Sequence, residues 1–363
     1  MLVRDLIGII DDLAPFRLAL DWDNPGLQCG DPGAALTGVA FCLDPTLDAM
    51  GKALGGGANA LVSHHPLIFK ELKSLPDGNP ELAALLFAVR NGLAVISAHT
   101  NWDAAGMAPA LAGVLGLKSL GFLEAAPLRL LKLVAFVPAG HEDRVSEAVF
   151  AAGAGHVGNY SKCSFQAPGT GTFLPGEGAN PAIGSQGELE KTPETRFEAL
   201  VPPKNRDRVA QALRASHPYE EPAFEFQETA LDRAFGFGLL GEWDPPREPL
   251  SYLAKRLGTP AFPVAGRMPK TLGKVALMPG SGGSYARAAK ALGAGLLITG
   301  DLGHHQALLA RDLGICVASL GHHETESPGV AALRREVAER LGPGIKTFLT
   351  NDGSPIEIWA GGR

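Results

Sequence analysis

Residues 60–69 read ALVSHHPLIF, and this stretch gives the first indication of the fold. It opens with a short apolar run, which is typical of a strand buried on both faces of a sheet. Similar runs occur at Val39–Leu43, Leu93–Ser97, Val275–Met278, Leu296–Thr299 and Ile315–Ser319. Stretches that favour helices lie between or after these runs, at Leu82–Asn91, Tyr285–Leu292 and Val330–Leu341. This alternation predicts an α/β fold in which most strands pair in parallel.

The region from 128 to 230 has a different pattern. It contains, in order, the strand-like run LRLLKLVAFVP (128–138), a helix at Val145–Ala152, a glycine-rich stretch at Gly153–Gly187, a strand, a helix and a strand. This β-α-loop-β-α-β order is close to a ferredoxin-like unit of about 100 residues. We therefore expect an inserted ferredoxin-like α+β domain at 128–230 and a discontinuous outer α/β domain at 1–127 plus 231–363. A disordered low-complexity segment is the alternative for Pro168–Gly187, where small and turn-forming residues dominate.

The composition indicates a folded protein without a membrane anchor. A length of 363 residues suggests two or three domains, and 45% apolar residues exclude intrinsic disorder. The net charge of −6 gives no footprint for nucleic acid or an anionic membrane. No apolar stretch approaches the roughly 18 residues of a membrane helix, and MLVRDLIGIIDDL (1–13) resembles a helix more than a signal peptide. Four scattered cysteines show neither a disulfide framework nor zinc spacing, so we expect a cytoplasmic location.

Seven of the ten histidines lie in four short motifs. The motifs are SHHP (63–66), HTNWD (99–103), TGDLGHH (299–305) and GHHETE (321–326). Each motif follows a predicted buried strand within a few residues. Because ligand sites in open α/β sheets gather outside the carboxyl ends of the strands, we expect the four motifs to share one edge of a sheet and to converge there.

The residue types in these motifs are those of metal ligands. His99 and Asp103 are four residues apart, as are His322 and Glu326, and this spacing places both side chains on one face of a helical turn. Imidazole together with carboxylate suits zinc, iron, manganese or nickel and argues against a calcium site. Four imidazoles and two carboxylates exceed the needs of one tetrahedral ion. Two ions bridged by a carboxylate would use all six groups.

Each motif also has an ordinary structural explanation when it is taken alone. Adjacent histidines occur at surfaces and in satisfied cores, HTNWD can be a strand end followed by a turn, and Glu326 can complement the first turn of a helix. Their joint occurrence after four strands favours a shared metal site. His305 is then left for a substrate contact or proton transfer, and Asp301 for orienting a ligand imidazole or capping a helix.

Two further motifs are less specific. PGSGGSY (279–285) follows a strand and opens a helix, so its N–H groups can receive phosphate, although a tight turn that requires glycine explains it equally well. In DWDNPGLQCG (21–30), turn chemistry alone accounts for Asp23 and Asn24. The nucleophile and zinc-protease motifs GxSxG and HExxH are absent.

At these motifs the chain resembles the NIF-three-like family of dinuclear metal proteins, often called GTP cyclohydrolase I type 2 homologues. The resemblance covers nearly the whole chain, through WDNPGLQ (22–28), SHHPLIF (63–69), AHTNWD (98–103), GSGG (280–283), TGD (299–301) with His305, and GHHETE (321–326). It implies that two divalent ions are held by His64, His65, His99, Asp103, His322 and Glu326. His323 is not included, because the family often has an aromatic or other residue at that place.

The middle region resembles the inserted domain of the longer family members. The matching stretches are GAGHVGNYSKCSF (153–165), GTGTFLPGEGANPAIG (169–184) and HPYEEPA (217–223). In the family, this domain is similar to small trimeric signalling and cation-tolerance proteins. The resemblance also implies a homo-oligomer, since family members resemble ring-shaped hexamers.

These observations favour a metal-dependent hydrolase that acts on a nucleotide or a related small molecule. Two divalent ions, whether zinc, iron or manganese, would lower the pKa of a bridging water toward neutrality. Asp103 or Glu326 would bridge the ions, and His305 or Asp301 would transfer protons. The alternative is a non-catalytic metal-handling or regulatory protein, because no general base is recognisable outside the ligand set.

Overall fold

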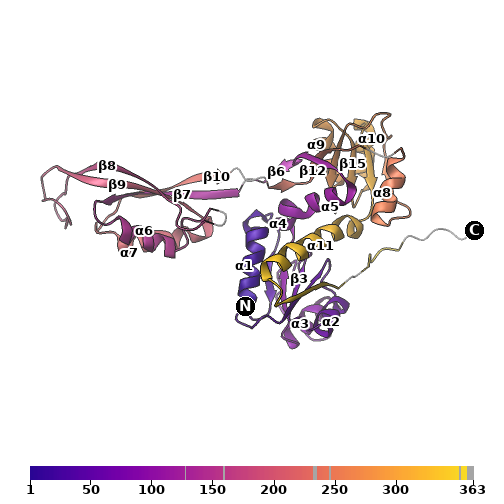
Figure 1. The fold of residues 1–363 in the computed structure, drawn as a ribbon, viewed down its shortest axis with the longest axis horizontal. Helices are drawn as coiled ribbons and strands as arrows, with labels where there is room; N and C mark the ends of the chain where they lie inside the picture. Colours follow the sequence, from indigo (N-terminus) through magenta and orange to yellow (C-terminus); the bar gives the residue numbers. More distant parts are fainter. Residues whose placement is uncertain (127, 158–159, 232–234, 245–246, 351–352, 358–363) are drawn as a thin grey trace, which may run out of the picture. The chain divides into compact units, whose positions relative to one another are not determined.

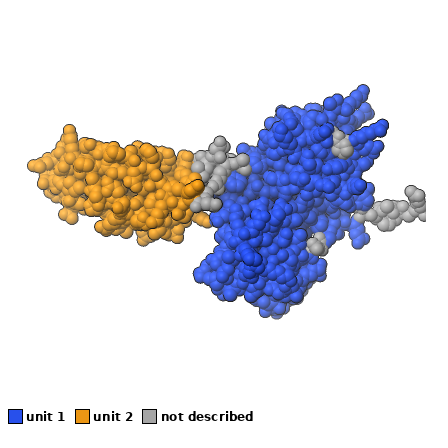
Figure 2. Space-filling model, in the orientation of Figure 1, with its two compact units in different colours: residues 1–126, 234–363 blue, residues 127–233 orange. Residues whose placement is uncertain are grey.

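The computed structural model describes residues 1–126, 128–157, 160–231, 235–244, 247–350 and 353–357. The protein has a mixed α/β architecture (Figure 1). It divides into two compact units, residues 1–126 with 234–363 and residues 127–233, which Figure 2 colours blue and orange. The domain boundary expected at 127/128 involves residue 127, which lies outside the described residues.

A five-stranded sheet forms one half of the first unit. In spatial order it consists of β1 (Gly26–Cys29), β4 (Ala94–Ser97), β3 (Ala60–Ser63), β2 (Gly38–Cys42) and β17 (Lys346–Leu349). All neighbours are parallel except β1, which runs antiparallel to β4. One face is covered by α1 (Val3–Leu13) and α11 (His322–Leu341), the other by α2 (Leu47–Gly55) and α3 (Ala83–Arg90). Burial on both faces explains the continuous apolar runs of the central strands.

A six-stranded sheet forms the other half of this unit. Its order is β13 (Val264–Ala265), β16 (Cys316–Ser319), β15 (Ala294–Thr299), β14 (Lys274–Met278), β12 (Leu239–Glu242) and β5 (Lys118–Gly121). The three central strands, β14 to β16, are parallel. One face packs on α5 (Ala108–Leu115) and α8 (Pro249–Leu257), the other on α9 (Ala286–Ala291) and α10 (His304–Leu313). A short pair, β6 (Glu124–Ala125) with β11 (Gly236–Phe237), completes the unit.

The four histidine motifs follow strands of two different sheets, so the expectation of a single shared sheet edge is wrong. SHHP and HTNWD follow β3 and β4 of the five-stranded sheet, whereas TGD and GHHETE follow β15 and β16 of the six-stranded sheet. Apolar runs identify buried strands but do not reveal which strands pair with one another. The motifs still meet, because the rings of His65 and His322 lie 5.4 Å apart between their centroids.

Helix α11 connects the two sheets. It begins directly after β16, ends before β17, and packs against α1 and α5 (Figure 1). The sequence predicts this helix only from Val330, but it begins at His322 and contains Pro328 in its interior. A proline inside a helix costs a hydrogen bond, and here the buried face formed by Val330, Leu333 and Val337 offsets that loss.

The second unit is an antiparallel sheet packed on two helices. The sheet order is β10 (Phe224–Leu231), β7 (Leu128–Pro138), β9 (Glu190–Val201) and β8 (Phe165–Phe173). The helices α6 (Glu142–Ala151) and α7 (Arg206–Ser216) pack together with the apolar face of the sheet. Along the chain the order is β-α-β-β-α-β.

Strand β8 corrects the assignment of Gly153–Gly187 to a loop. Its nine residues pair in continuous register with β9, from Phe165 opposite Glu198 to Phe173 opposite Glu190. Backbone hydrogen bonds make this pairing, so it leaves little hydrophobic pattern in the sequence. Pro168 is tolerated because β8 is an edge strand. The disordered alternative is therefore wrong for this part of the stretch.

No helix within the described ranges has the length and apolar character that crossing a membrane requires.

Candidate metal centre

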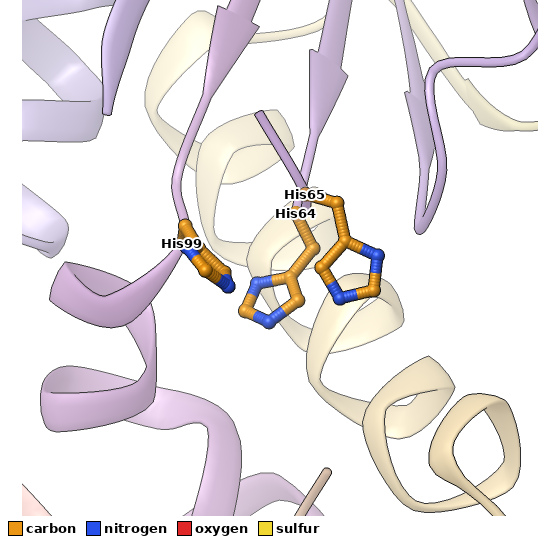
Figure 3. Close-up of side chains that lie close together, drawn as sticks. All are labelled: His64, His65 and His99. Carbon is orange, nitrogen blue, oxygen red and sulfur yellow. The ribbon is translucent and has the colours of Figure 1, made fainter. Parts of the chain in front are cut away.

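The six side chains expected to bind metal lie together at the ends of the two sheets. His64 and His65 follow β3, and His99 follows β4, so Figure 3 shows their rings as neighbours at the ends of adjacent strands. Asp103 begins the π-helical turn η3 (Asp103–Met107), which follows the short helix α4 (Thr100–Trp102). His322 and Glu326 stand one turn apart at the start of α11.

Glu326 lies at the centre of this cluster. Its Oε2 atom is 3.1 Å from Nε2 of His322, 3.3 Å from Nε2 of His65 and 3.8 Å from Nε2 of His64. On its other side, Nε2 of His64 is 3.5 Å from Oδ1 of Asp103. A single carboxylate thus faces three imidazole nitrogens.

Three overlapping sets of three residues each offer ligand atoms within 4.8 Å of one another. The sets are His64 with His65 and His99, His65 with His322 and Glu326, and His64 with Asp103 and Glu326. Each of the six residues belongs to at least one set, and His64, His65 and Glu326 belong to two. Shared members are what neighbouring sites for two ions require.

Each of the four imidazoles forms a hydrogen bond through Nδ1. The partners are the Ala98 carbonyl for His64 (2.9 Å), Asp44 for His65 (2.7 Å), Asp23 for His99 (2.8 Å) and Asp301 for His322 (2.6 Å). Because all four partners are acceptors, Nδ1 carries a hydrogen, and in the neutral ring the lone pair is left on Nε2. This tautomer is the one that binds metal through Nε2, with the acceptor fixing the orientation of the ring.

The three carboxylates that hold these rings also come from strand ends. Asp44 and Asp301 lie two residues after β2 and β15, and Asp23 precedes β1, which runs antiparallel and therefore starts at the same edge. From the sequence, Asp301 is expected to orient an imidazole or cap a helix, and Asp23 to form a turn, whereas Asp44 is not predicted to take part. The position of Asp44 directly after the predicted strand Val39–Leu43 was the available signal.

The electrostatics of the cluster favour positive charge at two of the imidazoles, His65 and His322. Burial alone would lower the pKa of His65, but the neighbouring carboxylates of Asp44 and Glu326 outweigh it and raise the pKa to about 10. The carboxylate of Glu326, 3.1 Å from Nε2, raises the pKa of His322 to about 9. His64 differs, since burial lowers its pKa to about 3 and keeps its ring neutral.

The pKa values of the two carboxylates within the cluster, Asp103 and Glu326, are shifted in opposite directions. Burial and the neighbouring Glu326 raise the pKa of Asp103 well above its usual range. Burial would also raise the pKa of Glu326, but the surrounding imidazoles outweigh it and lower that pKa. Two carboxylates this close resist ionising together unless a cation lies between them. A divalent ion would supply that charge.

Two buried polar atoms at the centre have no hydrogen-bond partner within the described part of the chain. They are Nε2 of His64 and Oε2 of Glu326. An unsatisfied buried polar atom costs roughly 1–3 kcal/mol, and native structures contain few of them. Both atoms are metal-ligand types, and each belongs to two of the three ligand sets. The donor set therefore fits divalent metal ions.

Close packing against α11 positions Asp103. Nε1 of Trp102 donates a hydrogen bond to the Gly329 carbonyl of α11 at 3.0 Å. A Cβ on Gly106 would overlap the Trp102 ring, and one on Gly329 would overlap the sulfur of Met107. Both glycines thus allow the π-helical turn to approach α11. Such turns are frequent at functional sites, and this one brings Asp103 toward Glu326.

The loop PGSGGSY (279–285) borders the cluster as a tight turn. Gly280 has φ +60°, and a Cβ there would overlap Oε1 of Glu326. The N–H of Gly280 donates to Oγ1 of Thr325 and the N–H of Gly282 to Oγ1 of Thr299. Since these N–H groups are already used, the geometry favours the turn interpretation over a phosphate-binding loop.

The structure places His305 and His323 outside the cluster. His305 is exposed at the start of α10, where its ring lies 5.5 Å from that of His304. His323 is half-buried, and its ring nitrogens lie 3.3 Å from Oγ of Ser327. Proton transfer by His305 remains a prediction.

Similarity to known proteins extends over nearly the whole chain. A family model described as Duf34/NIF3 (NGG1p interacting factor 3) matches residues 1–353. The "GTP cyclohydrolase 1 type 2 homolog" of Mycobacterium tuberculosis is 36% identical over 365 residues, covering 96% of each chain. The protein of the same name in Halalkalibacterium halodurans is 35% identical over 327 residues, or 88% of each chain. A solved structure, the Bacillus cereus protein related to NIF3, is 31% identical with a TM-score of 0.75 over 99% of each chain.

Proposed function

The chain belongs to the Duf34/NIF3 family, and from this premise we propose that it is a dinuclear metal-dependent hydrolase that acts on a small molecule. The observation that carries the proposal is the convergence of four pre-oriented imidazoles on two inner carboxylates. Each imidazole directs its Nδ1 to a carbonyl or carboxylate, and so presents Nε2 as a ligand atom.

The ligands of the two ions are His64, His65, His99, Asp103, His322 and Glu326. Their three overlapping sets support two ions that share ligands. Glu326 would serve better than Asp103 as the carboxylate common to both ions, because its Oε2 lies within 3.8 Å of three imidazole nitrogens. Zinc, iron and manganese all accept such a mixture of imidazole and carboxylate.

Two bound divalent ions supply an activated water and stabilise negative charge that develops on the substrate. The chain itself fixes the ligands, since Asp23, Asp44 and Asp301 hold three of the rings. Asp301 is also the group placed to exchange a proton with solvent. Its side chain is 47% exposed and accepts hydrogen bonds from both His322 and Ser281.

Residues 128–230, which lie within the compact unit 127–233, are proposed to be a ferredoxin-like domain inserted into the outer α/β domain. The β-α-β-β-α-β order supports this proposal. The pairing of Ala125 with Gly236 in the β6–β11 ladder also supports it, because an insertion requires neighbouring ends in the host domain. A homo-oligomer such as a hexamer, and a cytoplasmic location, rest on the family resemblance and the cysteine usage.

A non-catalytic metal-handling or regulatory role is the second candidate. It is favoured because Asp23, Asp44 and Asp301 each accept a hydrogen bond from an imidazole, so the described cluster offers no carboxylate outside the ligand set that is free to act as a general base. A protein that only binds and transfers metal needs no such group.

Turnover by metal-loaded protein separates the two candidates. We expect at least one compound of a panel of nucleosides, nucleotides, cyclic amides and esters to be hydrolysed at a rate proportional to protein concentration. The rate should be lost in Asp103→Ala and kept in Asp48→Ala, which changes an exposed aspartate on α2. Hydrolysis that persists at the full rate in Asp103→Ala would come from a contaminant. No turnover across the panel would favour the metal-handling role.

A further inference from the structure

A cavity of about 520 Å³ lies beside the metal centre. Asp44, His65, Asp301 and His322 form part of its lining, so a molecule inside it reaches the ligands from one side of the cluster. The remainder comes mainly from residues 258–263 and 319–324. This volume is typical of sites for small molecules.

Much of the remaining lining is apolar. Pro260, Phe262 and Pro263 come from the loop before β13, and Leu320 follows β16. Phe262 is half-buried and packs against the core of the six-stranded sheet, which holds its ring in place. The backbone N–H of Ser319 donates to the Pro263 carbonyl at 3.0 Å and fixes the loop against β16. The apolar surface is thus preformed.

When metal is bound and His65 and His322 are neutral ligands, the charges of the cavity do not suit a polyanion. Its described lining contains no lysine or arginine, whereas Asp44, Asp301 and Glu324 contribute carboxylates. Two carboxylates within the ligand cluster and three around it, when all are ionised in the metal-bound state, carry one more negative charge than two divalent ions supply; they are Asp103 and Glu326, with Asp23, Asp44 and Asp301. Proteins bind phosphate chains with arginine, lysine and free N–H groups; this lining offers neither side chain, and the first-turn N–H groups of α11 that it contains lie beside the carboxylate of Glu324.

Two of the three hydroxyl groups in the described lining already donate within the protein. Oγ of Ser319 donates to the Gly300 carbonyl at 2.6 Å, and Oγ1 of Thr259 donates to the Leu320 carbonyl at 3.0 Å. The third, Oγ of Ser354, accepts a hydrogen bond from the N–H of Ile356 at 3.4 Å. One hydroxyl hydrogen does not hold a phosphate chain, so recognition in this cavity depends mainly on apolar contact and on the metal ligands.

We infer that the cavity binds an uncharged, largely apolar small molecule and excludes nucleoside polyphosphates. This inference rests on the proposed metal-dependent function, whose substrate it specifies. The sequence led us to expect a nucleotide or a related small molecule as substrate. The cavity restricts this expectation to uncharged compounds, such as a free base, a nucleoside or another neutral heterocycle. Phe262 supplies the apolar contact, and the metal centre receives the polar group of the molecule.

Three hydroxamates test this assignment, because they share one metal-binding head and differ in the body attached to it. Calorimetry on zinc-loaded protein would compare acetohydroxamate, benzohydroxamate and 4-carboxybenzohydroxamate. Burial of the phenyl ring should make benzohydroxamate bind about tenfold more tightly than acetohydroxamate. The added carboxylate should remove this gain.

Two variants show where the phenyl ring lies. Phe262→Ala should lower the affinity for benzohydroxamate to near that of acetohydroxamate while zinc content stays unchanged. Phe122→Ala is the matched control, since Phe122 packs on the same core but does not line the cavity. Equal affinities for the three compounds, tighter binding of the carboxylated one, or no effect of Phe262→Ala would overturn this inference alone. Failure of acetohydroxamate to bind the zinc-loaded protein would overturn the proposed metal centre and the inference with it.

Discussion

Nδ1 of His99 lies 2.8 Å from Oδ1 of Asp23, a carboxylate 76 residues earlier in the chain. The other oxygen of Asp23 accepts a hydrogen bond from the backbone N–H of Thr100 at 3.0 Å. Asp23 thus joins the loop before β1 to the start of α4 and fixes the rotation of the His99 ring. Burial alone would raise the pKa of Asp23, but hydrogen bonds from His99 and Thr100 outweigh it and lower it to about 2. The carboxylate is therefore ionised at neutral pH.

Removal of this carboxylate should weaken metal binding without removing a ligand. In Asp23→Ala the His99 ring is free to rotate and to change tautomer, so we expect metal affinity to fall about 10–100-fold. Competition with a chromophoric chelator measures the affinity. Asp21→Ala is the matched control, because Asp21 is exposed in the same loop and should have no effect. Unchanged affinity in Asp23→Ala would contradict the orienting role.

Glu326 and His322 should affect the two ions differently. Glu326→Gln keeps the shape of the side chain but removes the charge that faces three imidazoles, so affinity for both ions should fall. His322→Ala removes one neutral ligand and should weaken chiefly one ion. Metal content and melting temperature of both variants provide the measurement.

The ordinary explanation of Glu326 predicts a different result. If Glu326 only complements the first turn of α11, the glutamine variant loses about 0.3–1 kcal/mol of stability and keeps its metal. Glu324→Gln is the control for that effect, since Glu324 lies in the same first turn. Full metal occupancy in Glu326→Gln would remove Glu326 from the site.

The residues of the site were more predictable from the sequence than their arrangement. His64, His65, His99 and His322 follow strands whose continuous apolar runs are visible in the sequence, and strand β7 matches its predicted bounds of 128–138. Pairing between strands depends on contacts far apart in the chain, which is why the division of the four motifs over two sheets was missed. Strand β8 was missed because backbone pairing leaves little side-chain pattern.

The carboxylates around the imidazoles were harder to find. Asp23 and Asp44 have no spacing relation to the histidines that they hold, since their hydrogen bonds span 76 and 21 residues. The predicted helix begins at Val330, whereas α11 begins at His322 and continues through Pro328, which tertiary packing stabilises. These features depend on how the two sheets meet.

Metal affinity should continue to rise with pH well above the ordinary range of histidine. The pKa values of about 10 for His65 and about 9 for His322 mean that both rings carry a proton at neutral pH when no metal is bound. Metal binding must displace these protons, so affinity increases as the pH rises toward 9. Chelator competition from pH 6.5 to 9 measures this dependence.

If His65 and His322 had ordinary histidine pKa values, the metal affinity would depend on pH in a different way. With values near 6.5, the affinity would level off by about pH 7.5. Such a plateau in the wild-type protein would show that the carboxylates do not hold protons on His65 and His322. In Asp44→Asn the rise should end at a lower pH, because His65 loses the neighbouring negative charge that raises its pKa.

The unit of residues 127–233 should be dispensable for metal binding. All six proposed ligands lie in the other unit, as do Asp23, Asp44 and Asp301, which hold the imidazole rings. A short Gly/Ser linker from Ala126 to residue 234 should therefore leave a folded protein with unchanged metal content, since the β6–β11 pairing already holds the ends together. Circular dichroism and elemental analysis provide the measurement. A folded but metal-free product would contradict the ligand assignment.

The number of ions per chain tests the central claim most directly. Protein without a histidine tag is incubated with excess zinc, iron(II) or manganese(II), desalted, and measured by elemental analysis against its amino-acid content. Four imidazoles and two carboxylates in three overlapping sets predict two ions per chain for at least one of these metals. A content that stays at or below one ion per chain with all three metals would contradict the dinuclear centre.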